Sequence, residues 1–179
     1  DTDERRRFAQ VSHEYLIEQL QYQTQAASES TELNFNHPVK EVIWGGTPTG
    51  TSAVEATGEG GPAILRATTG TTTWHFKLNG HDRFAPRAPE YFSRQQVYDH
   101  HSGFGGVQFR DTILVYSFAL KPEEHQPSGT CNFSRIDNAS LQLTLRTTAG
   151  YQGRKLRVYA VNYNVLRIMS GMGGLAYSN

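Results

Sequence analysis

The sequence has a single cysteine, no net charge and no long apolar run. Cys131 has no partner for an internal disulfide, and an unpaired thiol fits a reducing compartment better than secretion. The 17 basic and 17 acidic side chains cancel, which leaves no charge excess for binding nucleic acid or an anionic membrane. No apolar stretch approaches the roughly 20 residues that a membrane-spanning helix needs. The chain starts at Asp1 without a visible signal peptide, so we expect a fragment or a processed chain.

Alternating apolar and polar residues predict a chain built mainly from β-strands. Its 179 residues are enough for one domain with a core, and abundant Gly, Thr and aromatic residues favour strands joined by turns. Leu141 to Leu145 alternates as a half-buried strand does, whereas Ile113 to Leu120 is apolar on both faces and predicts a strand buried from both sides. Further strands are predicted at 33–37, 39–44, 74–78, 156–161, 165–169 and 175–177. About seven or eight short strands with uneven loops fit a two-sheet sandwich or jelly-roll.

Some segments leave the local pattern ambiguous. His13 to Tyr22 has Leu16, Ile17 and Leu20 at helical spacing, and the pattern alone slightly favours a helix over a strand. The dipeptide Asn79-Gly80 predicts a tight turn, although the polar, Pro-rich residues after it make a poor return strand. A short helix is predicted at 90–101. The Gly- and Thr-rich residues 45–73 predict a long surface excursion with at most one short strand.

Residues that could carry chemistry do not converge. Asp99, His100 and His101 are adjacent, and neighbouring residues on a helix or strand point in different directions, so they chelate one ion poorly. Cys131 has no histidine placed beside it and is better explained as a buried structural thiol. Glu123 and Glu124 are sequence neighbours in a Pro-bounded loop, which does not suit a glycosidase pair. We therefore predict no catalytic residues, no metal site and no cofactor.

Two local patterns suggest surface contacts. The basic run Arg5, Arg6 and Arg7 could dock on an acidic surface of a neighbour, or simply solvate a short helix within the charged segment 1–10. Asn132 and Asn138 each begin an N-x-[ST] triplet, the acceptor pattern for glycosylation. That pattern is short and often coincidental, and both sites fall in a predicted strand region. We do not expect conventional glycosylation at either asparagine.

Long blocks of this sequence resemble one known family, in the order that the family has them. They are DTDERRRFAQVSHEYLIEQLQ, LNFNHPVKEVIW, KLNGHDRFA, YSFALKP, QPSGTCNFSRIDNASLQL and YAVNYNVLRIMSGMGGLAYSN. These blocks cover well over half of the chain. They resemble the C-terminal jelly-roll of the major capsid proteins of large double-stranded DNA viruses, the chlorovirus, mimivirus and iridovirus group. The resemblance also places a strand, and not a helix, after His13.

The resemblance implies an all-β fold, an antiparallel eight-stranded jelly-roll sandwich with short helices in its loops. Residues 1–12 would be the connector from a first jelly-roll, and residues 13–179 the second jelly-roll of a longer double jelly-roll protein. Three copies would form a capsomer with a pseudo-hexagonal outline, and capsomers would tile an icosahedral shell. The expected partners are the homotrimer, neighbouring capsomers, minor capsid proteins and surface glycans, without nucleic-acid contact or membrane insertion. The expected location is the virion shell, made and assembled in the host cytoplasm.

Such a subunit needs complementary surfaces more than reactive side chains. Aromatic residues outside the clearest strands are candidate interface anchors, with core filling as the alternative; they are Tyr91, Phe92, Tyr98, Phe104 and Phe109. Two rival functions use the same fold. A carbohydrate-binding module would use exposed aromatics, and a jelly-roll enzyme such as a cupin or glycanase would need a reactive centre. We expect a structural protein and not an enzyme.

Overall fold

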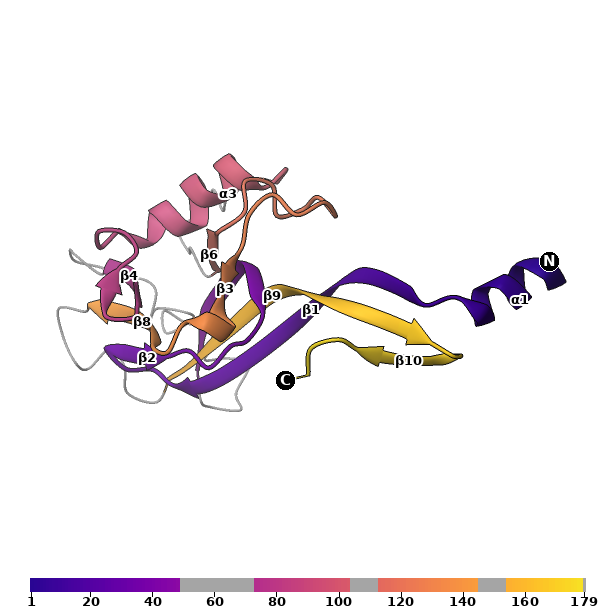
Figure 1. Ribbon diagram of the computed structural model, residues 1–179. Coiled ribbons are helices and arrows are strands. Elements are labelled where there is room, and N and C mark those ends of the chain that lie inside the picture. Colours follow the sequence, from indigo (N-terminus) through magenta and orange to yellow (C-terminus); the bar gives the residue numbers. More distant parts are fainter. Residues whose placement is uncertain (49–72, 104–112, 145–153, 179) are drawn as a thin grey trace.

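The computed structural model describes residues 1–48, 73–103, 113–144 and 154–178, which form two antiparallel sheets (Figure 1). The first sheet runs in the order β1 (His13–Ala26), β9 (Arg154–Met169), β3 (Pro38–Pro48) and β6 (Leu114–Ser117). On it, β10 (Met172–Leu175) pairs with β9, and β7 (Cys131–Asn132) pairs with β3. The second sheet has the order β2 (Ser30–Glu32), β8 (Ala139–Thr144), β4 (Thr73–Leu78) and β5 (His81–Asp82). The expected all-β jelly-roll sandwich with short helices is confirmed.

The core lies between the sheets and is rich in aromatic rings. Trp44 of β3 meets Trp74 and Phe76 of β4 at ring-centroid distances of 5.8 and 5.6 Å. All three side chains are at most 1% exposed. Aliphatic residues of both sheets fill the space around them, including Val42, Leu114, Leu141, Leu156 and Val158. The predicted strands at 74–78, 141–145 and 156–161 thus owe their place to one buried face, as alternation requires, with residue 145 outside the described residues. The strand predicted at 113–120 is confirmed only over β6, which is buried at every position, whereas Ile113 and Leu120 are exposed.

The segment at 13–22 is a strand, as the resemblance implied, and the slight helical preference of its pattern was wrong. Fourteen residues of β1 pair in continuous register with β9, from His13 opposite Ile168 to Ala26 opposite Lys155. That ladder supplies a backbone partner at every step, which outweighs a weak local preference. The strand expected separately at 165–169 is the continuation of the 16-residue β9. The last strand, β10, begins earlier than expected, after the turn at Ser170 and Gly171.

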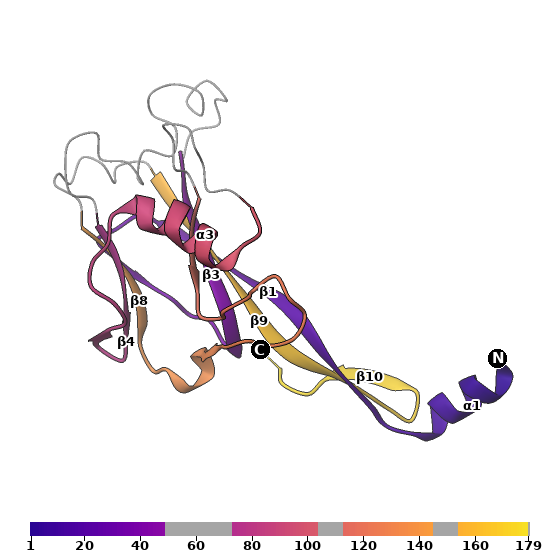
Figure 2. The same cartoon turned by 90° about the horizontal axis from the view of Figure 1, so that it is seen from above.

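The first sheet extends beyond the sandwich as a ribbon. Partners of β9 in β3 stop at Asn162, which faces Val39, and from Tyr163 onward β9 pairs only with β1 and β10. We call residues 1–18 and 163–178 the arm. It consists of the start of β1, the end of β9, β10 and the helix α1 (Thr2–Gln10) at its tip. Figures 1 and 2 show the arm projecting from the sandwich with α1 far from the core.

Helices and turns differ from the sequence expectations mainly in their limits. The helix expected at 90–101 is a π-helical turn, η2 (Tyr91–Gln95), continued by α3 (Gln96–His100). Asn79 and Gly80 form the expected turn with φ of 51° and 79°, and a return strand does follow, although β5 has only two residues. Residues 45–48 belong to β3 and not to the loose excursion, and 49–72 lie outside the described residues.

Glutamine side chains replace a backbone ladder along residues 32–36. Leu33 and Phe35 are buried and Asn34 and Asn36 exposed, as alternation predicted, but this segment is not a paired strand. Instead Gln21 of β1 donates to the Asn36 carbonyl and accepts from the Asn36 amide at 2.9 Å. Gln23 does the same with the Glu32 carbonyl and the Asn34 amide. A primary amide offers both a donor and an acceptor, so it can satisfy a backbone as a neighbouring strand would.

The variant Gln21→Glu tests this amide pairing. A carboxylate can still accept from the Asn36 amide but places negative charge against the Asn36 carbonyl, so we expect a loss of about 1–3 kcal/mol of unfolding free energy. Denaturant unfolding measures it. Gln25→Glu on the same strand is the control, because Gln25 only accepts from Gln23, which a carboxylate also does. Equal stability of the two variants would contradict the pairing.

Candidate functional site

Exposed apolar side chains gather on the arm. It carries eight of the 13 large apolar side chains that are exposed within the described residues. They are Phe8, Val11, Tyr15, Leu16, Met169, Met172, Leu175 and Tyr177. Leu20 and Tyr22, 63% and 50% exposed, continue the row along β1 towards the sandwich. Exposed apolar side chains gathered on one projecting part of the fold are typical of a contact with another protein surface.

Contacts between its own residues hold the arm together, although it has no hydrophobic core of its own. Arg167 and Glu14 face each other across β9 and β1 with a contact of 2.6 Å, and the buried Asn164 donates to the Tyr177 carbonyl at 2.9 Å. At the tip, the His13 ring stacks on Phe8 at 4.1 Å. These contacts fix the shape of the ribbon. Because a narrow ribbon is at best marginally stable alone in water, its apolar faces need a covering surface.

The basic run lies at the tip of the arm. Arg5, Arg6 and Arg7 are on α1, which has no buried residue, and Arg6 faces Asp3 at 3.7 Å. Asp1 caps the start of the helix, because its carboxylate accepts from the Asp3 amide. The structure therefore brings the arginines together with the exposed apolar residues of the arm. Sequence reasoning missed those apolar residues, although Tyr15, Leu16 and Leu20 stood in a segment whose pattern fitted neither a buried helix nor a half-buried strand cleanly.

The aromatic candidates separate into different environments. Phe92 is fully buried against Trp44 and Phe84, with ring distances of 5.1 and 5.6 Å, so the core-filling alternative holds for it and it is not an interface anchor in this structure. Tyr91 is half-buried, lies under the Arg87 guanidinium and accepts from Gln96. Tyr98 is 82% exposed on α3. The remaining candidates, Phe104 and Phe109, lie outside the described residues.

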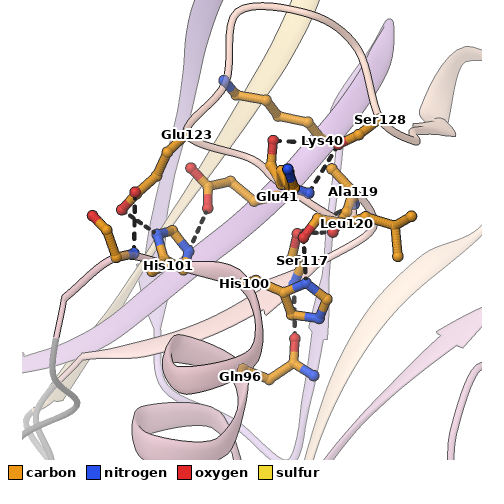
Figure 3. A network of polar contacts seen from close by, with 12 residues as sticks. Lys40, Glu41, Gln96, His100, His101, Ser117, Ala119, Leu120, Glu123 and Ser128 are labelled. Atoms are coloured by element: carbon orange, nitrogen blue, oxygen red, sulfur yellow. Dashed lines mark hydrogen bonds and ion pairs between the residues drawn. The ribbon is translucent and has the colours of Figure 1, made fainter.

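Three adjacent residues at the end of α3 have separate partners. Asp99 accepts from Gln95, the Nδ1 atom of His100 lies 3.0 Å from the Leu120 carbonyl, and His101 lies between Glu41 and Glu123 (Figure 3). They do not converge, as their adjacency predicted. The described residues hold no group of three or more ligating side chains that could bind a metal ion.

His101 fastens α3 to two other elements. Its Nε2 atom lies 3.1 Å from Glu41 of β3, and its Nδ1 atom lies 3.2 Å from Glu123. Burial raises the pKa of the Glu41 carboxyl. Hydrogen bonds from Ser102 lower the pKa of Glu123, which accepts from the Ser102 amide at 3.1 Å. We call His101, Glu41 and Glu123 the clamp. Because its three side chains contact one another, the clamp holds these parts of the fold together.

A buried ion pair stands where the arm leaves the sandwich. Lys40, whose side chain is 4% exposed, contacts Glu18 of β1 at 2.7 Å and lies 5.5 Å from the centre of the Tyr163 ring. The register between β3 and β9 shifts between Val39 and Glu41, which marks a bulge at Lys40. Sequence reasoning missed this pair. The signal was a charged dipeptide, Lys40-Glu41, inside an otherwise apolar strand.

The other residues that the sequence analysis singled out include Cys131 and the two asparagines of the N-x-[ST] triplets. Cys131 is half-buried, and burial raises the pKa of its thiol, which disfavours the reactive thiolate. Asn132 accepts from the Ser134 amide, and Asn138 is exposed. Among the described helices, none is both long and apolar enough to cross a membrane.

Comparison with known proteins agrees with this fold. Residues 4–174 match the family described as large eukaryotic DNA virus major capsid protein. The chain is 50% identical to a major capsid protein of Pyramimonas orientalis virus, with all of this chain and 46% of that protein covered. It is 44% identical to one of Paramecium bursaria Chlorella virus 1, with all of this chain and 52% of that protein covered.

A solved structure gives the same result. A chain of the PBCV-1 virus capsid superposes with a TM-score of 0.76 at 37% identity, covering all of this chain and 55% of that one. The chain thus spans about half the length of the curated relatives it matches. A sequence match over nearly the whole chain and a fold match over all of it lead to one conclusion: this chain belongs to the family of large eukaryotic DNA virus major capsid proteins.

Proposed function

We propose that the chain is the second jelly-roll of a longer double jelly-roll capsid protein, with residues 1–12 as its connector and 13–179 as the domain. Membership of the capsid family supports a structural role in the virion shell, and the relatives are about twice as long as this chain. The function is assembly and not catalysis. Three copies form a capsomer, which contacts neighbouring capsomers and minor capsid proteins, after synthesis and assembly in the host cytoplasm.

The observation that carries this proposal is the bare apolar surface of the arm. The eight side chains named above are 39–75% exposed, and five of them, Tyr15, Leu16, Met169, Met172 and Leu175, sit on the paired strands β1, β9 and β10. A rigid ribbon presents the same contact in every copy, which repeated assembly requires. The arginines of α1 add charge at the rim of that surface, where polar groups set orientation. We do not propose the carbohydrate-binding alternative, because the family match accounts for the jelly-roll.

Charged substitutions on the arm test the assembly role. In the intact protein, Met172→Asp places a charge on a 75% exposed residue of β10, and we expect it to weaken trimer formation at least about tenfold. Sedimentation velocity across a concentration series measures the association. Leu120→Asp, at a residue 71% exposed outside the arm, is the matched control and should associate as the wild type does.

Two outcomes would contradict the proposal. One is a wild-type protein that stays monomeric at micromolar concentration. The other is a Met172→Asp protein that forms trimers as well as the Leu120→Asp control does. Thermal unfolding of both variants separates lost association from lost folding.

A further inference from the structure

One imidazole lies between two carboxylates in the clamp. The Nε2 atom of His101 faces Glu41 at 3.1 Å and its Nδ1 atom faces Glu123 at 3.2 Å (Figure 3). The side chains of His101 and Glu41 are only 17% and 10% exposed, whereas that of Glu123 is 47% exposed. The three groups come from α3, β3 and the segment 118–128. Each contact therefore joins two parts of the fold that are far apart in the sequence.

Both contacts are favourable only while the cluster holds an extra proton. A neutral imidazole has one N–H, so with two ionised carboxylates one ring nitrogen would turn a lone pair towards a negative oxygen. The proton can sit on the ring or on Glu41, because burial raises the pKa of that carboxyl. In both arrangements the cluster binds the same number of protons. Besides His101, Lys40, which is next to Glu41 on β3, also acts on this carboxylate and lowers its pKa.

The neighbouring His100 provides a contrast within the same helix. Its Nδ1 atom faces the Leu120 carbonyl at 3.0 Å, and a neutral ring with one N–H satisfies that contact. The start of the segment is also tied to β3, because the amides of Phe118 and Ala119 donate to the Lys40 carbonyl. Only the contact at Glu123 depends on the second ring proton.

The other charged groups near the clamp have partners of their own. Lys121 and Glu124, on the same segment as Glu123, face each other at 3.1 Å and are mostly exposed. Asp99, on α3, accepts two hydrogen bonds from Gln95. Neither pair contacts His101, so the pH dependence of the clamp comes from its own three side chains.

We propose that His101, Glu41 and Glu123 form a pH-operated clamp, which ties the segment 120–128 to the end of α3 in mild acid and releases it as the pH rises. Release happens at Glu123, because its side chain is 47% exposed against 10% for Glu41, so water can replace the imidazole at Glu123 at the lower cost. The clamp goes beyond the capsid role proposed above and does not depend on it. It makes the shape of one exposed surface segment depend on pH.

The sign of the dependence follows from proton counting. The closed clamp holds one more proton than the open one, so closure weakens as the pH rises. At the acid end the sign reverses. Because the pKa of Glu123 is lowered in the closed form, its stabilising contribution is present above the ordinary carboxyl pKa and is lost as the pH falls through the lowered one. The clamp is therefore closed in a window between these limits.

Amide hydrogen exchange of the intact protein tests the clamp. The Ser102 amide donates to Glu123, so its protection, corrected for the intrinsic pH dependence of exchange, reports closure directly. Between about pH 5.5 and pH 8.5 we expect wild-type protection to fall about fivefold, the size of one lost hydrogen bond.

Two variants make the result decisive. In Glu123→Gln the amide oxygen can accept from Ser102 while the amide nitrogen donates to a neutral His101, so protection should stay constant with pH. In His100→Asn the clamp is intact, so the fivefold fall should remain. Wild-type protection that does not change with pH would overturn the proposal, and so would an equal fall in Glu123→Gln.

Discussion

The variant Phe92→Ala is expected to lose about 3–5 kcal/mol of unfolding free energy. Phe92 is fully buried and its ring packs against Trp44, Phe84 and Tyr91 at 5.1, 5.6 and 5.1 Å. Truncation removes the transfer free energy of the ring and leaves a cavity between side chains that cannot close over it. The loss is measured by denaturant unfolding with an unchanged dependence on denaturant, which reports stability alone.

The matched variant is Tyr98→Ala, two turns further along the same helical segment. Tyr98 is 82% exposed, so its removal should change stability by no more than about 0.5 kcal/mol. The pair separates core filling from an interface role within one short element. If Phe92→Ala kept its stability but lost association, Phe92 would be an interface anchor and not a core residue.

Removing Glu18 is expected to cost more than removing its partner Lys40. In Glu18→Ala the Lys40 ammonium, on a side chain 4% exposed, loses its carboxylate at 2.7 Å and keeps the Tyr163 ring and the longer-range attraction of Glu41. An unpaired buried charge is strongly destabilising, so we expect a loss of about 3 kcal/mol. In Lys40→Met the exposed part of Glu18 is solvated, and an apolar chain of similar length fills the site. The expected change is then within about 1 kcal/mol.

Thermal and denaturant unfolding of the two single variants and of the double variant measure this asymmetry. The coupling energy of the double-mutant cycle isolates the pair itself. A Lys40→Met variant that is as unstable as Glu18→Ala would contradict the expectation. The pair would then stabilise the foot of the arm by more than the cost of desolvating Lys40.

The residue pattern by itself determined the strands that have one buried face. Apolar and polar residues alternate over Trp74 to Leu78 and Leu141 to Thr144, because every second side chain points inward and must fill the core. The local sequence therefore shows this requirement as a period of two residues. The family could also be identified from long runs of residues before any coordinates, since those runs keep their order along the chain. The turn at Asn79 and Gly80 was predictable because few residues adopt positive φ without strain.

Tertiary structure alone decided the arm, the clamp and the glutamine pairing. His13 to Ala26 has no strong preference, and its 14 pairs with β9 made it a strand whose apolar residues remain exposed. His101 gained its partners because α3, β3 and the segment 118–128 meet in space, and no local pattern records which distant carboxylate a histidine will face. Short-range periodicity encodes which face of an element is buried. The choice of partner between distant elements depends on how the whole chain packs, so it becomes visible only in the folded structure.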